Sequence, residues 1–243
     1  MIARLVASLV VCLVFTLVSM APGPGVALVQ GQNVTVACGG QGTPPAAEPA
    51  EATPGAGGES ERVELETGEA LLWPAGDRGV LLLHGAAYDA ASWEPQASVL
   101  AGEGYTVLAL ETLSPEAVLE GNASLTGECG VAGVTIVGAS AGGGAALGAL
   151  ADDPAGVSGL ILLGATGEVE TLGDYPKLFT ASEGEGLADQ LETMADNAPG
   201  EGNETLILPG SAHAQAIFET DQGDVLIEAM LSFLEDTASW DAG

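Results

Sequence analysis

The chain has 243 residues, of which 47% are hydrophobic and only 4% aromatic, a composition that suits one globular domain with an aliphatic core. It carries 34 acidic and 4 basic residues, a formal net charge of −30. Four basic residues are too few to form a basic patch, so nucleic acid is excluded as an expected partner. The excess of acidic residues favours instead a folded protein that is adapted to high salt.

The N-terminal region begins with an apolar segment. Residues 5–20 are uncharged, follow Arg4, and end before a stretch rich in Pro and Gly. This length and these flanks are typical of a signal-peptide core or a short membrane anchor. Residues 35–40 are similar to a lipobox, in which Cys38 would carry lipid. We therefore expect residues 1–38 to be a signal peptide or anchor that brings an extracytoplasmic protein to the membrane or secretes it.

The remainder divides into a linker and a domain. Residues 39–60 are rich in Pro, Gly, Ala and Glu, a composition that predicts a disordered linker. In residues 61–238, strand patterns alternate with helical ones. Strands are expected at 62–73, 80–83, 105–110, 134–137, 159–163, 178–181 and 205–208, and helices at 92–101, after 137 to about 150, at 187–197 and at 225–234. This alternation predicts an α/β domain with a mostly parallel central sheet and helices on both faces.

The three cysteines do not form a recognisable framework. Cys12 lies in the apolar N-terminal segment, and the chain has no Cys-x-x-Cys pair, so neither a zinc site nor a set of disulfides is expected. A disulfide between Cys38 and Cys129 is conceivable. The pattern favours Cys129 as a small side chain that is simply buried or half-buried.

A candidate nucleophile stands in the sequence Gly-Ala-Ser-Ala-Gly of residues 138–142, which fits the pattern G-x-S-x-G. An apolar strand enters this pentapeptide and a helix of small residues leaves it. Such a tight turn raises the serine hydroxyl above the sheet, which makes Ser140 the candidate nucleophile. The backbone N–H of Ala141 would point toward a developing oxyanion at the start of the helix. The alternative is a glycine-rich turn with an incidental serine.

Only two histidines can serve as the base that a catalytic serine needs, His84 and His213. His213 follows the last expected strand and should lie at the same edge of the sheet as Ser140. His84 ends an early strand and precedes Gly85. It is better explained as a structural histidine that bonds to backbone and shapes the loop that follows.

An acid should orient the histidine. Where a serine stands on such a turn, the chain order is serine, acid, histidine, so the acid falls between residues 140 and 213. The loop after the strand at 178–181 contains Glu183 and Glu185. Glycines flank Glu185 on both sides and allow its side chain to turn toward His213. We expect Glu185 to hold the imidazole tautomer, with Glu183 as the competing candidate.

Together these motifs resemble the α/β-hydrolase family, and within it the compact, capless branch of dienelactone-hydrolase-like and small carboxylesterase-like proteins. The likeness spans about residues 80–234 and includes Leu-His-Gly at 83–85 and Pro-Gly-Ser-Ala-His at 209–213. It implies that the N–H of Ala86 is the second oxyanion donor. It also implies no cap domain, because few residues separate 163 from 177. A serine nucleophile and a Glu acid depart from dienelactone hydrolases proper and favour a serine esterase.

The expected function is therefore hydrolysis of a small-molecule acyl substrate, an ester or a related acyl compound, through an acyl-enzyme, with no metal or cofactor. Peptidase, thioesterase or lipase chemistry would use the same triad and remains an alternative. A second alternative is a non-catalytic binding module tethered at the cell surface, which predicts a misaligned Glu185–His213 pair. The sequence does not indicate an oligomeric state.

Overall fold

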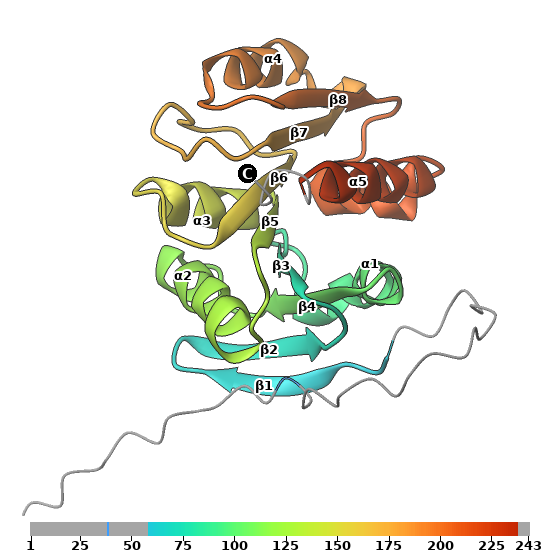
Figure 1. Ribbon diagram of the computed structural model, residues 1–243. Helices are drawn as coiled ribbons and strands as arrows, with labels where there is room; N and C mark the ends of the chain where they lie inside the picture. The colour runs from blue at the N-terminus through green and yellow to red at the C-terminus, as the bar shows by residue number, and fades with distance from the viewer. Residues whose placement is uncertain (1–37, 39–57, 238–243) are drawn as a thin grey trace, which may run out of the picture. The chain divides into compact units, whose positions relative to one another are not determined.

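The computed structural model describes residue 38 and residues 58–237 of the chain (Figure 1). The expected signal or anchor segment, apart from Cys38, and most of the expected linker lie outside these described residues. Among the described residues, none of the helices combines the length and apolar character required to span a membrane.

Within residues 58–237, eight strands form one sheet in the order β1-β2-β4-β3-β5-β6-β7-β8. The β1–β2 and β2–β4 pairs are antiparallel and every other pair is parallel. The prediction of a mostly parallel sheet is thus confirmed. The strands are β1 (Glu61–Leu65), β2 (Gly68–Trp73), β3 (Arg78–Leu83), β4 (Tyr105–Leu110), β5 (Val134–Ala139), β6 (Val157–Leu163), β7 (Lys177–Ser182) and β8 (Glu204–Leu208).

Helices cover both faces of the sheet, as expected (Figure 1). One face is covered by α1 (Glu94–Gly102) and α5 (Gly223–Thr237), and the other by α2 (Pro115–Ala123), α3 (Ala141–Leu150) and α4 (Ala188–Asn197). All residues of β4, β5 and β7 are buried, which is why these strands read as continuous apolar runs rather than as alternating patterns.

Neither α2 nor the π-helical segment η2 (Ser124–Glu128) that continues it was predicted from the sequence. A start signal was present: the Ser114 side chain accepts a hydrogen bond from the Ala117 N–H at 3.2 Å, and Pro115 occupies the first turn. The two glycines Gly121 and Gly127 weaken the helical pattern of this region and hid the signal.

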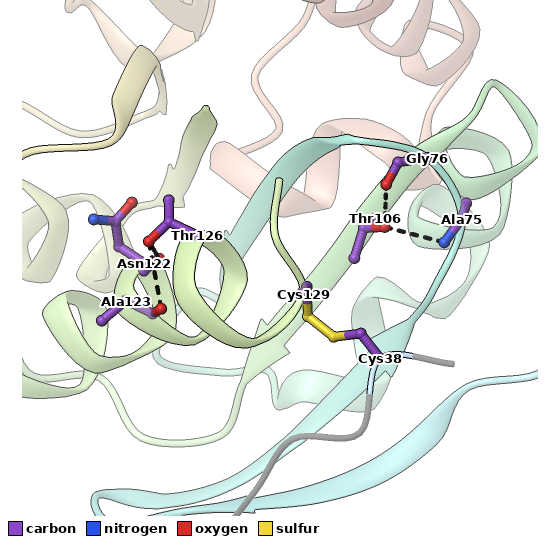
Figure 2. Close-up of a disulfide and its surroundings, with 8 residues drawn as sticks. All are labelled: Cys38, Ala75, Gly76, Thr106, Asn122, Ala123, Thr126 and Cys129. Carbon is purple, nitrogen blue, oxygen red and sulfur yellow. Dashed lines mark hydrogen bonds between the residues drawn. A yellow bond between two sulfur atoms is a disulfide. The ribbon is translucent and has the colours of Figure 1, made fainter. Parts of the chain in front are cut away.

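A disulfide joins Cys38 to Cys129, directly after η2 (Figure 2). The interpretation of Cys129 as a simple buried thiol was therefore wrong. The cysteines are 91 residues apart, and Cys38 also contacts the apolar core. No local sequence pattern encodes either the disulfide or this core contact. Because the Cys38 sulfur is already bonded, this disulfide and a lipid on Cys38 exclude each other.

The parallel strands bring the site residues to one edge of the sheet. The segments that follow the carboxyl ends of β3, β5, β7 and β8 carry His84, Ser140, Glu185 and His213 respectively. The connection from β6 to β7, residues 164–176, contains neither helix nor strand and runs back across α3 to the start of β7.

Candidate active site

Ser140 lies on the turn between β5 and α3. Its backbone has φ 50° and ψ −108°, a positive φ that L-residues seldom adopt and that occurs where the surrounding structure enforces it. The Ser140 N–H donates to the carbonyl of Leu163 at 2.9 Å, and its carbonyl accepts from the Gly144 N–H at 3.1 Å. These bonds hold the turn between the end of β6 and the first turn of α3.

The elbow requires small residues because strand and helix nearly touch. A Cβ on Gly138 would lie 2.6 Å from the Cα of Gly143, and a Cβ on Gly142 would lie 2.5 Å from the carbonyl oxygen of Leu83. Both distances are shorter than real carbon contacts allow, and both contacts are with backbone. Glycine at 138 and 142 is therefore a condition of the turn that carries Ser140.

His213 lies next to Ser140. It follows β8 and immediately precedes the 3₁₀ helix η4 (Ala214–Glu219). Its Nε2 is 2.8 Å from the Ser140 Oγ, a hydrogen-bonding distance at which imidazole can accept the hydroxyl proton. The His213 side chain is 56% exposed, so the pair is open to solvent and to a substrate.

Glu185 lies on the other side of the imidazole, in the short helix η3 (Glu183–Glu185) after β7. Its Oε1 is 2.5 Å from His213 Nδ1, and its Oε2 accepts the Ser182 N–H at 2.7 Å. The Glu185 side chain is only 8% exposed, whereas Glu183 is exposed to solvent. Of the two candidate acids, the structure brings Glu185 to the histidine.

Two glycines support this pair: Gly184, which was expected from the sequence as a neighbour of Glu185, and Gly164, which was not. Gly164, at the end of β6, has φ 57°, and a Cβ there would lie 3.0 Å from both Glu185 Oε1 and the His213 ring. Gly184 donates its N–H to the carbonyl of Gly210 at 2.8 Å, which ties the acid loop to the histidine loop. A glycine at the end of a buried strand was the available signal for Gly164.

The expected oxyanion donors lie beside the nucleophile. The Ala141 N–H is the first of α3 and has no acceptor within its helix. The carbonyl of Gly85 accepts the Tyr88 N–H at 3.0 Å and lies 2.8 Å from His84 Nδ1. In a trans peptide the N–H points opposite to the carbonyl, so these two contacts fix the direction of the Ala86 N–H. A Cβ on Gly85 would be 4.0 Å from the Ser140 Cβ, which places this loop against the nucleophile.

Comparison with known proteins supports the fold at low sequence identity. No family model and no curated protein matches the chain. Among solved structures, a predicted CIB-like hydrolase from Thermoplasma acidophilum matches with a TM-score of 0.58 at 17% identity, over 73% of this chain and 98% of that one. An esterase from Exiguobacterium antarcticum matches with a TM-score of 0.56 at 15% identity, over 73% and 100%. Carboxylesterase CesB from Bacillus subtilis matches with a TM-score of 0.57 at 15% identity, over 72% and 91%.

This chain has the α/β-hydrolase fold. In this fold ligands are bound at the carboxyl ends of the parallel strands, which is where Ser140, His213 and Glu185 meet. Within residues 58–237 and at Cys38, no group of three or more His, Cys, Asp or Glu side chains could hold a metal ion.

The other histidine of this α/β-hydrolase domain bonds to backbone, as expected. His84 is buried, with Nδ1 at 2.8 Å from the Gly85 carbonyl and Nε2 at 3.2 Å from the Glu111 carbonyl. The aromatic side chains of Trp93 and Tyr175 are buried in the core. Tyr88 is half-buried, with its ring against Gly85, and its pKa is raised by partial burial and by the neighbouring Glu219.

Proposed function

We propose that the protein is a serine hydrolase that cleaves an ester or a related acyl bond through a Ser140–His213–Glu185 triad. The observation that carries the proposal is the continuous chain of hydrogen-bonding contacts from Ser140 Oγ through both nitrogens of His213 to Glu185 Oε1, at 2.8 and 2.5 Å. The three side chains come from three separate loops, so this alignment does not follow from their proximity in sequence.

In the proposed reaction, His213 Nε2 takes the Ser140 hydroxyl proton while Oγ attacks the substrate carbonyl. The carboxylate of Glu185 accepts from Nδ1–H. It thereby leaves Nε2 free to act as the base, and it stabilises the imidazolium that forms. His213 then returns the proton to the leaving group, which departs and leaves an acyl group on Ser140.

Negative charge develops on the carbonyl oxygen during this attack. The N–H groups of Ala86 and Ala141 are the donors proposed to bind it, because both lie next to Ser140 and α3 adds the positive end of its dipole. In the second half of the reaction, water attacks the acyl group with His213 again acting as the base. This half-reaction releases the acid and restores Ser140.

The aligned Glu185–His213 pair argues against the alternative of a non-catalytic binding module, which would not need it. The class of acyl bond is a separate question, because esterases, thioesterases, peptidases and lipases share this fold and triad. The half-exposed His213 leaves the site open to a small ester, which is therefore the first substrate class to test. A panel of p-nitrophenyl esters of increasing acyl length, with a thioester and an anilide, distinguishes these classes.

The test compares ester hydrolysis by the wild-type protein with that of Ser140→Ala. We expect the variant to lose activity by a factor of about 10⁴ or more, since the nucleophile is removed. Ser232→Ala is the matched control, because Ser232 is exposed on α5, away from the site, and should retain full activity. Undiminished hydrolysis by Ser140→Ala would rule out the proposed mechanism.

We propose further that the enzyme acts outside the cytoplasm. The Cys38–Cys129 disulfide supports this proposal, because disulfides persist in oxidising compartments. Intact-mass analysis after alkylation of the unreduced, native protein is the test. With the disulfide formed, neither Cys38 nor Cys129 should take up the alkylating reagent. Alkylation of Cys129 together with a lipid-sized mass on Cys38 would contradict the disulfide and favour a lipoprotein.

A further inference from the structure

The helix η4, which directly follows His213, contacts the loop that carries the proposed oxyanion donor. Phe218 and Trp93 pack edge to face with ring centroids 5.8 Å apart. The Tyr88 hydroxyl donates to Glu219 Oε1 at 2.9 Å. Gln215, two residues after His213, also joins the two segments, through both ends of its side-chain amide.

Gln215 is only 3% exposed, yet both ends of its amide have partners. Its Oε1 accepts the backbone N–H of Gly85 at 3.2 Å. Its Nε2 donates to the Ser92 Oγ at 2.8 Å, and the Ser92 hydroxyl in turn donates to the Asp89 carbonyl. A buried side chain with this pattern spans the loop from its first peptide to the start of the next helix.

The contact with Gly85 fixes a particular peptide plane. The His84 carbonyl and the Gly85 N–H belong to one peptide unit, which is planar and rigid. Its carbonyl accepts the Gly142 N–H of α3 at 3.1 Å, and its N–H donates to Gln215. The unit is therefore held on one side by the helix that begins at Ser140 and on the other by the helix that begins after His213. The next peptide N–H along the chain is that of Ala86.

We propose that Gln215 is a positioning residue for catalysis: by holding the His84–Gly85 peptide, it aims the Ala86 N–H at the oxyanion. The inference rests on the proposed serine-hydrolase function. It links the base and the oxyanion donor to a single short helix, so both move together relative to Ser140. Gln215 itself would not touch the substrate.

The decisive variant is Gln215→Met, which keeps the length of the side chain and removes both polar ends. The Gly85 N–H then loses its acceptor inside the protein, and the peptide can rotate toward another partner. We expect kcat for an ester substrate to fall about 10- to 100-fold with KM changed less than about threefold, because the interaction with the oxyanion forms only in the transition state.

A conservative variant separates positioning from packing. Gln215→Glu retains an oxygen that can accept the Gly85 N–H, so it should recover most of the kcat that Gln215→Met loses. Asn122→Leu is the matched control, because it also replaces a buried amide that bonds to backbone. Asn122 lies on α2 and its side-chain amide donates to the Ala155 carbonyl at 3.0 Å. It should lower the melting temperature and leave kcat unchanged.

Wild-type kcat in Gln215→Met, or equal losses in Gln215→Met and Gln215→Glu, would overturn the inference. If Gln215→Met does not fold, Ser92→Ala takes its place, because it removes the acceptor of Gln215 Nε2. This variant should lower kcat several-fold at constant KM. An unchanged kcat would refute the proposal. A wild-type protein with no Ser140-dependent hydrolysis would instead refute the proposed function itself, so the two failures are distinguishable.

Discussion

Glu183 and Glu185 are separated by a single glycine, but only one of them faces the histidine. The short helix η3 turns the chain between them, so Glu183 points to solvent while the Glu185 carboxylate lies between the Ser182 N–H and His213. Gly186, with φ 69°, then ends the turn in a conformation that glycine adopts without strain. The geometry therefore gives the two acids different expected roles.

Replacing Glu185 by Gln should lower kcat by roughly 10²- to 10⁴-fold, because an amide can hold the imidazole in the wrong tautomer and cannot stabilise its positive charge. KM for a small ester should change little. Glu183→Gln is the control and should behave as the wild type. Steady-state kinetics of the two variants is the measurement, and equal losses in both would contradict the assignment of Glu185.

Lys177 is a residue whose role the sequence did not indicate. It is fully buried at the start of β7, and its Nζ donates to the carbonyls of Gly173, Tyr175 and Pro199 at 2.6 to 2.8 Å. We predict that Lys177→Met lowers the free energy of unfolding by roughly 3 kcal/mol, because three buried carbonyls lose a charged donor. Urea unfolding checks this, and a variant as stable as the wild type would contradict it.

The same lysine gives stability a pH dependence. Burial lowers the pKa of Lys177 to about 8, against the opposing effect of Asp174 and Asp153, from an ordinary value of 10.5. Between pH 8 and 10.5 the unfolded chain therefore binds more protons than the folded one, so this group makes the free energy of unfolding rise with pH. The difference in stability between wild type and Lys177→Met should widen over this range. A constant difference would contradict the lowered pKa.

The side chains that meet at the candidate site could be chosen from the sequence, whereas the residues that support them could not. Ser140 stands in a local motif, and with two histidines in the chain, the choice of His213 followed from its position after a late strand. Gly164 and Gln215 act through contacts with residues far along the chain, such as Glu185 and Gly85. No local pattern contains that information.

For helices and strands, runs of buried residues were the most reliable signal of position in the sequence. β4 and the end of α3 match the predicted ranges, because all-apolar runs and Gly/Ala-rich helices have clear boundaries. The position of β3 between β4 and β5, and the antiparallel pairing of β2 with β4, depend on long-range packing instead. The disulfide also escaped prediction for this reason.

The disulfide should stabilise the fold without affecting the chemistry. It closes a long loop, because its two cysteines are 91 positions apart in the sequence, so Cys38→Ser combined with Cys129→Ser should lower the free energy of unfolding by roughly 3 to 5 kcal/mol. Cys129 lies before the start of β5 and Ser140 lies after its end, so the two residues are at opposite ends of this strand. The activity below the melting transition should therefore stay within about twofold of wild type. A large loss of kcat would contradict this separation.

The net charge of −30 is the main long-range electrostatic feature of this protein. Arg62 forms an exposed pair with Glu69, and Lys177 donates to carbonyls rather than to carboxylates, so little of the negative charge is neutralised by these cations. The folded state brings the remaining carboxylates closer together than the unfolded chain does. Repulsion between them should decrease as salt shortens the screening length from about 30 Å at 0.01 M to about 3 Å at 1 M.

We therefore predict that the melting temperature rises between 0.01 and 1 M sodium chloride. The expected increase is on the order of 10 °C, since each kcal/mol of relieved repulsion shifts the melting temperature of a domain of this size by about 2–4 °C. Calorimetry across the salt series is the measurement, with sodium chloride used because it has little of the surface-exclusion effect of sulfate. A melting temperature independent of salt would contradict the halophilic interpretation of the composition.

Covalent labelling tests whether Ser140 is a nucleophile that His213 activates. The protein is treated with a fluorophosphonate probe, digested, and the modified residue is located by mass spectrometry. We predict a single stoichiometric adduct on Ser140, formed at least about 10³-fold more slowly in His213→Ala, since the serine then lacks its base. Equal labelling of Ser140→Ala, or labelling at a rate independent of His213, would contradict the mechanism.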